Sequence, residues 1–342
     1  LANNCSDASA EVVRHFAARR PKLRLFVVEA QFPAAVAHVG HARACLMDEA
    51  CRRLLSHDLH HGVIASTDGD TCVAPDWLAA TLAEVQAGVD AVGGRILIAA
   101  GSGTNSGWQR FTRRDATYQR LRARLEHALD PDPADPWPRH HQHFGASLAI
   151  TARAYKQVGG LPAEPFLEDE ALYQAMRRND IKVRHSERVL VSTSNRHDGR
   201  VEVGLSWQLR EWEALARSRR QAMVSDPVAW AGEVVLRRRL RRLWSTRRDE
   251  RGHLASSARA RVPAMAVRLG VPARWLAARL NAGGPFGAIW HDVLGRQAGA
   301  EPAAPQVTLG AAIKAMRALL AQHQKMRRAR EDRVGRSRAA SP

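Results

Sequence analysis

The chain has 342 residues, of which 45% are hydrophobic and 25% are charged. This composition is typical of a globular protein and excludes an intrinsically disordered one. The length suits one large domain or two ordinary ones. No apolar run approaches the length of a membrane-spanning helix, and no signal segment opens the sequence. We therefore expect a soluble, cytoplasmic protein.

The net charge of +18 is distributed unevenly along the chain. Residues 1–200 hold 25 Lys and Arg against 23 Asp and Glu, a balance of +2, whereas residues 201–342 hold 27 against 11, a balance of +16. A surplus of this size in one half is typical of segments that bind nucleic acid or an anionic membrane surface. The charge by itself leaves both partners open.

Apolar residues recur alternately at helical and strand spacings through the first hundred residues. The pattern predicts helices between Asp7 and Pro21 and over 36–54 and 75–88, and strands over 22–29, 63–67 and 91–98. Alternation of this kind with short connections predicts an α/β fold with a doubly wound, mostly parallel sheet.

The alternation is interrupted at residues 99–142, which we interpret as a variable loop that shapes a substrate site. His140, His141 and His143 lie at its end, and we expect them to be exposed to solvent. The pattern then predicts a strand over 145–150, helices over 151–158 and from 168, and strands over 181–184 and 188–193.

Beyond residue 200 the sequence predicts helices only. They cover 205–215, 228–244, 264–280 and 311–326, and an arginine-rich tail that we expect to be disordered begins at about residue 327. We accordingly divide the chain into an α/β catalytic domain, residues 1–200, and a basic helical region, residues 201–342.

Two aspartates separated by one glycine follow the strand at 63–67. Asp68 and Asp70 thus lie at the carboxyl end of a buried strand, where open α/β sheets bind ligands. Two carboxylates in one crevice repel each other unless a cation lies between them, and a divalent ion that bridges phosphates is the usual solution. Taken alone, so short a motif is more often a solvated turn.

Taken together, however, the order and spacing of several motifs resemble the family 2 glycosyltransferases, which have the A-type nucleotide-diphospho-sugar transferase fold. The similarity runs from the first turn to about residue 200. The matching motifs are Asn3-Asn-Cys-Ser-Asp7, Gly40-His-Ala-Arg43, Asp68-Gly-Asp70, Ala91-Val-Gly-Gly94, Phe144-Gly-Ala-Ser-Leu-Ala-Ile150, Gly159-Gly-Leu161 and Glu168-Asp169.

The resemblance implies a role for each motif on the donor side. Asn4 and Asp7 would hold the nucleotide base, and Arg43 would meet the diphosphate. Asp70 would be the most direct ligand of a Mg²⁺ or Mn²⁺ ion, and Asp68 would support the metal or the ribose. Such an ion stabilises the charge that develops on a departing diphosphate.

On the acceptor side, the resemblance implies that Asp169 is the catalytic base and that Glu168 orients the acceptor or the helix. A carboxylate in this role removes the proton of the attacking hydroxyl. His197 lies where some relatives have a further metal ligand. Arg196 and Arg200 are weaker candidates for the diphosphate, and either would serve equally well as the partner of a surface acid.

The sequence also departs from the family pattern. The family's first strand is absent, so we expect an N-terminally truncated catalytic domain, and asparagine stands where aspartate is common in the first motif. No Gln-x-x-Arg-Trp element follows Asp169. Together with the lack of membrane helices, this favours transfer of single sugars over polymerisation.

We therefore expect metal-dependent, inverting, non-processive transfer of a sugar from a nucleotide-diphosphate sugar to an acceptor hydroxyl. A lipid-linked acceptor would agree with peripheral contact between the basic region and the inner, anionic face of a membrane. Two alternatives remain: a nucleotidyltransferase on a similar fold, and a nucleic-acid-binding protein built on residues 201–342. Against nucleic acid, the aromatic residues of that region fall at core-like helical spacings.

Overall fold

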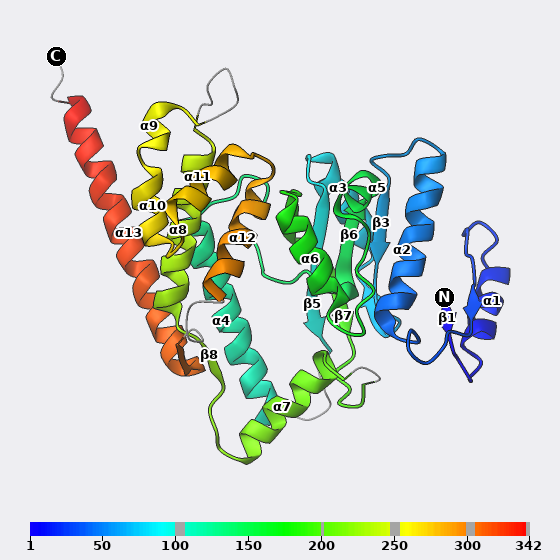
Figure 1. Ribbon diagram of the computed structural model, residues 1–342. Helices are drawn as coiled ribbons and strands as arrows, with labels where there is room; N and C mark the ends of the chain where they lie inside the picture. The colour runs from blue at the N-terminus through cyan, green and yellow to red at the C-terminus, as the bar shows by residue number, and fades with distance from the viewer. Residues whose placement is uncertain (100–106, 200–201, 247–253, 299–304, 340–342) are drawn as a thin grey trace.

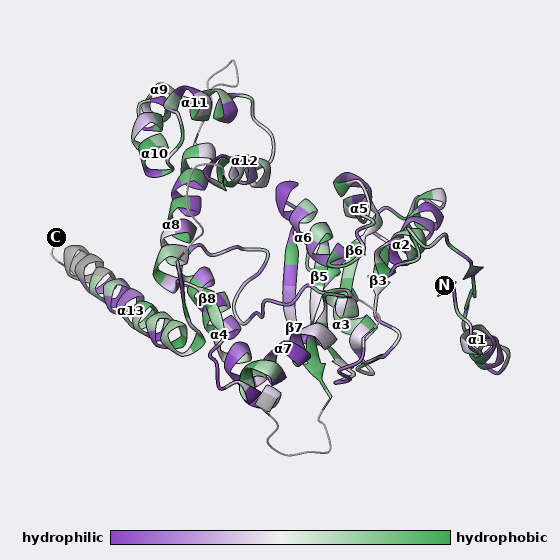
Figure 2. Cartoon of the chain, turned by 60° about the horizontal axis from the view of Figure 1, so that its bottom comes forward, coloured by the Kyte–Doolittle hydropathy of each residue, from purple (hydrophilic) through white to green (hydrophobic). Residues whose placement is uncertain are grey.

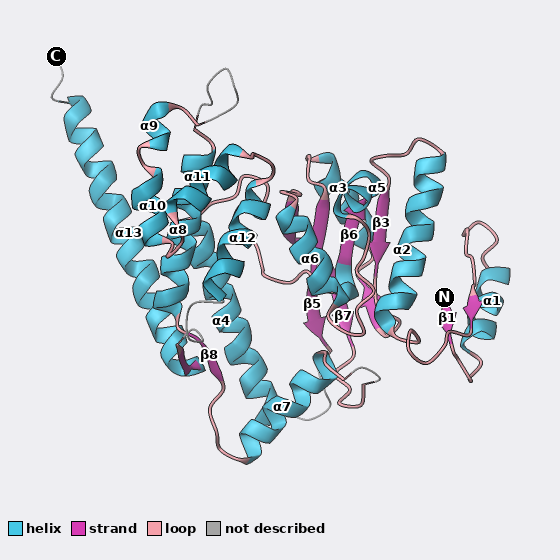
Figure 3. Ribbon diagram, in the orientation of Figure 1, coloured by secondary structure: helices cyan, strands magenta, loops and turns pink. Residues whose placement is uncertain are grey.

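The computed structural model of the protein describes residues 1–99, 107–199, 202–246, 254–298 and 305–339. The longer strands form a central sheet, and most helices of the C-terminal part gather on one side of it (Figures 1 and 3). None of the helices formed by these residues is both long enough and apolar enough to cross a membrane.

The central sheet has five strands in the order β3-β6-β5-β7-β4. Their bounds are β3 Val63–Ser66, β6 Leu148–Thr151, β5 Ala91–Ile98, β7 Val183–Thr193 and β4 Thr71–Val73. β5 and β7 pair in parallel, whereas β6 is antiparallel to both β3 and β5, and β4 is antiparallel to β7. β3, β5 and β7 therefore point in one direction.

The prediction of a mostly parallel sheet is correct for the common direction of these three strands. It is wrong for most pairs of neighbouring strands, because only β5 and β7 pair in parallel within this sheet. Parallel neighbours need a crossover that returns the chain to the starting edge. The helix between β5 and β6, α4 (Gly107–Leu129), instead packs against C-terminal helices. The chain then re-enters the sheet in the opposite direction as β6.

Alternate residues of the strands pack against helices on the two faces of the sheet, as the two-residue period of a strand requires. On one face, Ile150 packs with residues of α2 (Val39–Ser56), α5 (Ala152–Val158) and α6 (Glu168–Arg178). On the other face, neighbouring strand residues pack with α3 (Trp77–Gln86). The helices predicted at these positions are confirmed.

The strand predictions are correct in place but not always in extent. The two runs predicted at 181–184 and 188–193 form the single strand β7, whose register with β5 shifts between Gly94 and Arg95. The segment 22–29 contributes only the end of its run, as β2 (Glu29–Ala30). The reason is that its partner is the two-residue strand β1 (Ala2–Asn3), which leaves no ladder for a longer strand.

β1 and β2 flank α1 (Ser9–Ala18) and form a separate two-stranded parallel sheet. This N-terminal unit lies beyond α2, away from the rest of the chain, in two views of the molecule (Figures 1 and 2).

Three helices of the C-terminal part pack around α4. They are α7 (Leu205–Arg217), α8 (Pro227–Trp244) and α13 (Leu309–Ala339), and β8 (Met223–Ser225) pairs with β9 (Gln306–Thr308) beside them. The segment predicted as a variable loop thus contains a long helix, and residues predicted to be disordered from about 327 continue α13 as far as Ala339. The division of the chain at residue 200 stays a prediction, because α4 precedes it in sequence yet packs with the helices that follow.

A further small core joins the end of α8 to four short helices. They are α9 (Ser256–Arg259), α10 (Val262–Arg268), α11 (Ala273–Asn281) and α12 (Phe286–Ala298). The helix predicted over 264–280 is broken between α10 and α11. Gly270 there has a left-handed φ of 62°, and Pro272 cannot continue a helix from the preceding turn.

Candidate active site

Arg43 links three elements at the edge of the central sheet. One terminal nitrogen of its guanidinium donates to Oδ1 of Asp68, which follows β3, and the other donates to Oε1 of Glu168, at the start of α6. The Arg43 and Glu168 side chains are only 11% and 5% exposed. A buried pair of this kind is strongly dependent on both partners, because removal of either leaves a charge without solvent or counter-ion.

Two glycines allow this close packing. A Cβ at Gly40, one turn before Arg43 on α2, would overlap the backbone carbonyl oxygen of Glu164 in the loop before α6. A Cβ at Gly145 would overlap the Arg43 guanidinium itself. The Gly-x-x-Arg spacing found in the sequence therefore puts a point of close approach and an ion-pair donor on one face of the helix.

Asp169 is held in a fixed orientation by two backbone donors. The N–H of Gly145 donates to Oδ2 over 2.7 Å, and the N–H of Glu170 donates to Oδ1 over 2.8 Å. Each carboxylate oxygen has a second lone pair, so both can still accept from a bound molecule. Asp169 is half-buried, in contrast to the buried Glu168. Leu167, which precedes Glu168, has a left-handed φ of 57°, a conformation that is costly for a residue with a side chain.

The carboxylates of this cluster perturb one another. Burial raises the pKa of Asp68. The positive charge of Arg43 lowers this pKa in part, and the negative charges of Asp70 and Asp169 raise it further. Burial likewise raises the pKa of Glu168. Arg43 lowers this pKa in part, and the neighbouring acids Asp169 and Asp68 raise it. Crowded carboxylates with raised pKa values are typical of sites that bind a cation or transfer a proton.

Asp70 forms a solvent-exposed ion pair with Arg196, with 3.0 Å between Oδ2 of Asp70 and Nη2 of Arg196. Exposed pairs of this kind contribute little free energy and open readily. Arg196, a weaker candidate for the diphosphate in the sequence, is therefore the partner of an acid that was predicted to bind the metal.

The metal predicted for Asp68, Asp70 and His197 stays a prediction. In the part of the chain that the structure describes, no three His, Cys, Asp or Glu side chains are arranged to hold an ion. The oxygen donors of the two aspartates suit Mg²⁺ or Mn²⁺. In the structure, however, Asp68 pairs with Arg43 and Asp70 pairs with Arg196. The His197 ring lies edge-on to Trp108 at 5.9 Å.

Asn4 and Asp7 form hydrogen bonds within the N-terminal unit. The side chain of Asn4 both donates to and accepts from the backbone of Phe32, each over 2.9 Å. Asp7 accepts from the N–H of Ser9 at the start of α1. Both residues thus take part in hydrogen bonds of the N-terminal unit, and their contact with a nucleotide stays a prediction.

A buried histidine cluster behind the site was missed, because we expected these histidines to be exposed. His140 and His143 are 6% and 9% exposed. His143 stacks on Tyr173 with 3.7 Å between ring centroids, and its Nε2 lies 2.7 Å from Oε2 of Glu170. His143 thereby joins the strand entry at Gly145 to the first turn of α6. The position of His143, two residues before Gly145 in the predicted strand motif, was the sequence signal that could have indicated its burial.

Comparison with known proteins adds little to this geometry. No protein-family model and no curated protein matches the chain. Among solved structures, one that resembles it is a mannosyltransferase, PcManGT from Pyrobaculum calidifontis, in complex with GDP-Man and Mn²⁺. The two share 16% identity over 86% of this chain and 76% of the other, with a TM-score of 0.37. The function of the chain therefore has to be argued from its own residues.

Proposed function

We propose that the chain is a glycosyltransferase that moves a sugar from a nucleotide-diphosphate sugar to an acceptor hydroxyl. The observation that carries the proposal is the convergence of three acids near Arg43. Asp68 follows β3, Glu168 and Asp169 begin α6, and Arg43 lies on α2. The transfer has two chemical needs, a stabiliser for the departing diphosphate and a base for the acceptor. The cluster offers a group for each.

For the donor, Asp70 together with Asp68 would hold a Mg²⁺ or Mn²⁺ ion. The ion, when bound, supplies positive charge to the diphosphate as it leaves. The exposed pair between Asp70 and Arg196 is weak enough to give way to a divalent ion. Arg196 would then be free to meet the diphosphate. We assign Arg43 a different role from the predicted one, because its two terminal nitrogens already hold Asp68 and Glu168.

For the acceptor, Asp169 is a better base than its neighbour Glu168. Glu168 is buried and paired with Arg43, so its role is to position the start of α6. Asp169 retains solvent contact and is aligned by the two N–H donors. Direct attack of the activated hydroxyl on the face opposite the diphosphate would invert the anomeric centre. No processive element accompanies the site, so we propose transfer of single sugars.

The alternative of a nucleic-acid-binding protein loses support from the fold. Trp212 and Trp290, two of the tryptophans among the arginines of the basic region, are 8% and 6% exposed and belong to the protein core. They therefore cannot stack on bases, which is the usual use of aromatic residues in such proteins.

The test is turnover of a panel of nucleotide-diphosphate sugars, measured with and without Mn²⁺. We expect one donor to be consumed in a metal-dependent reaction. Asp169→Asn removes the base and should lower turnover by about 10²–10⁴-fold. Asp70→Asn should weaken the response to Mn²⁺ and leave the fold intact, because the ion pair of Asp70 with Arg196 is exposed to solvent and contributes little to stability.

The matched control is Asp76→Asn, the same substitution at an exposed aspartate six residues after Asp70 whose side chain makes no capping bond. It should leave turnover within about twofold. Full activity of Asp169→Asn, or no reaction with any donor, would contradict the proposal.

A further inference from the structure

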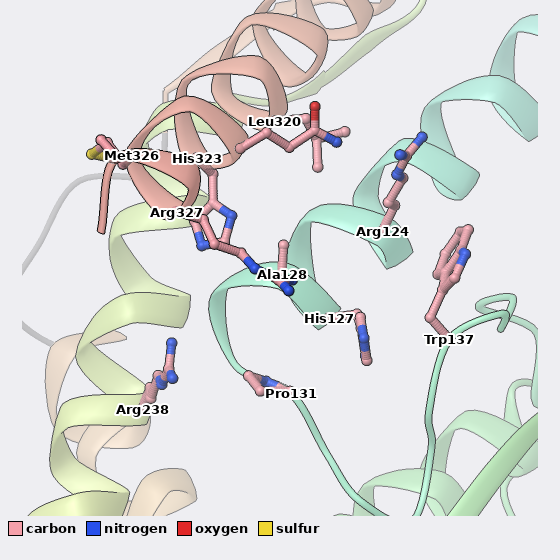
Figure 4. Close-up of a pocket in the computed structure, with 12 residues that line it drawn as sticks. Arg124, His127, Ala128, Pro131, Trp137, Arg238, Leu320, His323, Met326 and Arg327 are labelled. Atoms are coloured by element: carbon pink, nitrogen blue, oxygen red, sulfur yellow. The ribbon is translucent and has the colours of Figure 1, made fainter. Parts of the chain in front are cut away.

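A pocket of about 820 Å³ lies between α4, α8 and α13, and none of the residues assigned to the candidate active site lines it. Figure 4 shows Arg124 and His127 of α4 and Trp137 on one side of the pocket, and His323 and Arg327 of α13 on the other. A volume of this size falls within the range of ligand sites.

The lining is strongly cationic. The described residues that form it include three arginines, Arg124, Arg238 and Arg327, and two histidines, but no aspartate or glutamate. Arg238 also donates to the carbonyl of Leu129 over 2.7 Å and so compensates the carboxyl end of α4. This composition favours an anion over a neutral ligand.

The acids nearest to the pocket already have arginine partners. Asp130 accepts from Arg237 and Arg241, and Glu126 accepts from Arg237 and Arg139. Arg237 is 8% exposed, so this network is part of the core and not of the pocket wall. These acids therefore neutralise the arginines behind the pocket. Of the arginines that line it, Arg327 forms an ion pair with Glu331 on the same helix over 2.8 Å. Both of these side chains are exposed, so the pair contributes little free energy and gives way readily to a phosphate.

One further feature of the wall selects among anions. The ring centroids of His127 and Trp137 lie 6.4 Å apart. Trp137, Leu320 and Met326 supply apolar surface beside the charges. The pocket thus combines donors for oxyanions with room for a hydrophobic group.

We propose that this pocket binds a phosphate ester, with the phosphate held by Arg124, Arg327 and His323 and the remainder of the ligand against Trp137. Guanidinium groups match the geometry of phosphate oxygens. The ester could come from a phospholipid headgroup or from a soluble phosphorylated metabolite, and the pocket chemistry is the same for both.

The experiment is calorimetric titration of the full chain at fixed salt with three probes. They are dihexanoyl phosphatidic acid below its micelle concentration, glycerol 3-phosphate, and dihexanoyl phosphatidylcholine as a lipid without net charge. We expect at least one of the first two to bind about tenfold more tightly than the phosphatidylcholine. Tight binding of phosphatidic acid alone identifies a lipid headgroup, and equal binding of glycerol 3-phosphate identifies a soluble ester.

Variants then locate the binding. Arg124→Gln with Arg327→Gln should weaken it about tenfold or more. The matched control, Arg120→Gln with Arg317→Gln, removes the same charge from exposed positions on the same two helices and should change it less than twofold. If the first pair fails to fold, His323→Gln alone provides the pocket variant. Equal weakening by both pairs, or no preference for either phosphate, overturns the proposal.

Discussion

Arg43 is the residue on which the candidate site depends most. It is almost enclosed, and its two partners, Asp68 and Glu168, lie 25 and 125 residues further along the chain. Glu168, the more deeply buried of these partners, has a pKa raised by burial. A carboxyl with a raised pKa holds its proton in the folded state more firmly than in the unfolded one. Its contribution to stability therefore falls as the pH rises above the unfolded value of 4.5.

We predict that Arg43→Met lowers the free energy of unfolding by about 3–5 kcal/mol at pH 7.5, because Glu168 is left charged and without a partner. The loss should shrink as the pH falls toward 4.5, where the carboxyl protonates. Urea unfolding at both pH values measures it. The control is Arg52→Met on the same helix, which removes an exposed pair with Glu49 and should leave the free energy of unfolding nearly unchanged. A loss that is equal at both pH values would contradict the assignment.

At the scale of elements, the loop that leads into β6 is anchored by its histidines. His140 is 6% exposed, and its Nε2 lies 3.1 Å from the carbonyl oxygen of Ser186 on β7. Burial lowers its pKa to about 3, and the charge on His185 acts in the same direction. The unfolded chain binds a proton at about pH 6.5 that the folded chain excludes. The contribution to stability is therefore complete above pH 6.5 and is lost as the pH falls below it.

We predict that lowering the pH from 7.5 to 5 costs about 2 kcal/mol at this one position, since unfolded histidine is then protonated. His140→Gln should reduce the acid sensitivity of unfolding by that amount, even though it lowers stability at neutral pH. Unfolding by urea at the two pH values is the measurement. His61→Gln, at an exposed position, should leave the pH dependence unchanged. The lowered pKa values of Asp135 and Glu126 act below about pH 4.5 and do not interfere.

At the scale of the whole molecule, the N-terminal unit is much less well anchored than the central sheet. Among residues 1–38 only Ala10 is buried, and β1 and β2 form a ladder of two residues each. The unit also leaves several large apolar side chains exposed: Val12, Phe16, Leu23, Phe26 and Val28. Few buried contacts and few shielded hydrogen bonds give a region a low free energy of local opening.

We predict that backbone amides of residues 1–32 exchange with solvent at least tenfold faster than those of β5 and β7. Hydrogen exchange followed by mass spectrometry of peptides from both regions measures the difference. The two central strands pair with each other along their lengths and carry fully buried residues such as Val92 and Val191, so they serve as the internal reference. Equal protection of the two regions would show that the N-terminal unit is part of the same cooperative core.

Local patterns were sufficient where a short run of residues decides the outcome. The helices at α2, α3, α5, α6 and α7, and the strands β3 and β5, follow from apolar periodicity. Of the predicted site residues, Asp68 and Asp70 follow β3, and Glu168 and Asp169 begin α6. Long-range contacts decided the rest. The burial of His143 depends on Tyr173 and Glu170, about thirty residues away. The antiparallel entry of β6 depends on where α4 packs.

The sequence by itself determined which residues are candidates for the chemistry, because carboxylates at strand and helix ends are recognisable from their neighbours. Only the tertiary structure decided what those carboxylates contact. Arg43 bonds to two acids and Arg196 pairs with Asp70, while Asn4 and Asp7 form hydrogen bonds within a unit of their own. The physical reason is that periodicity and capping act within a few residues along the chain, whereas an ion pair depends on how distant elements pack.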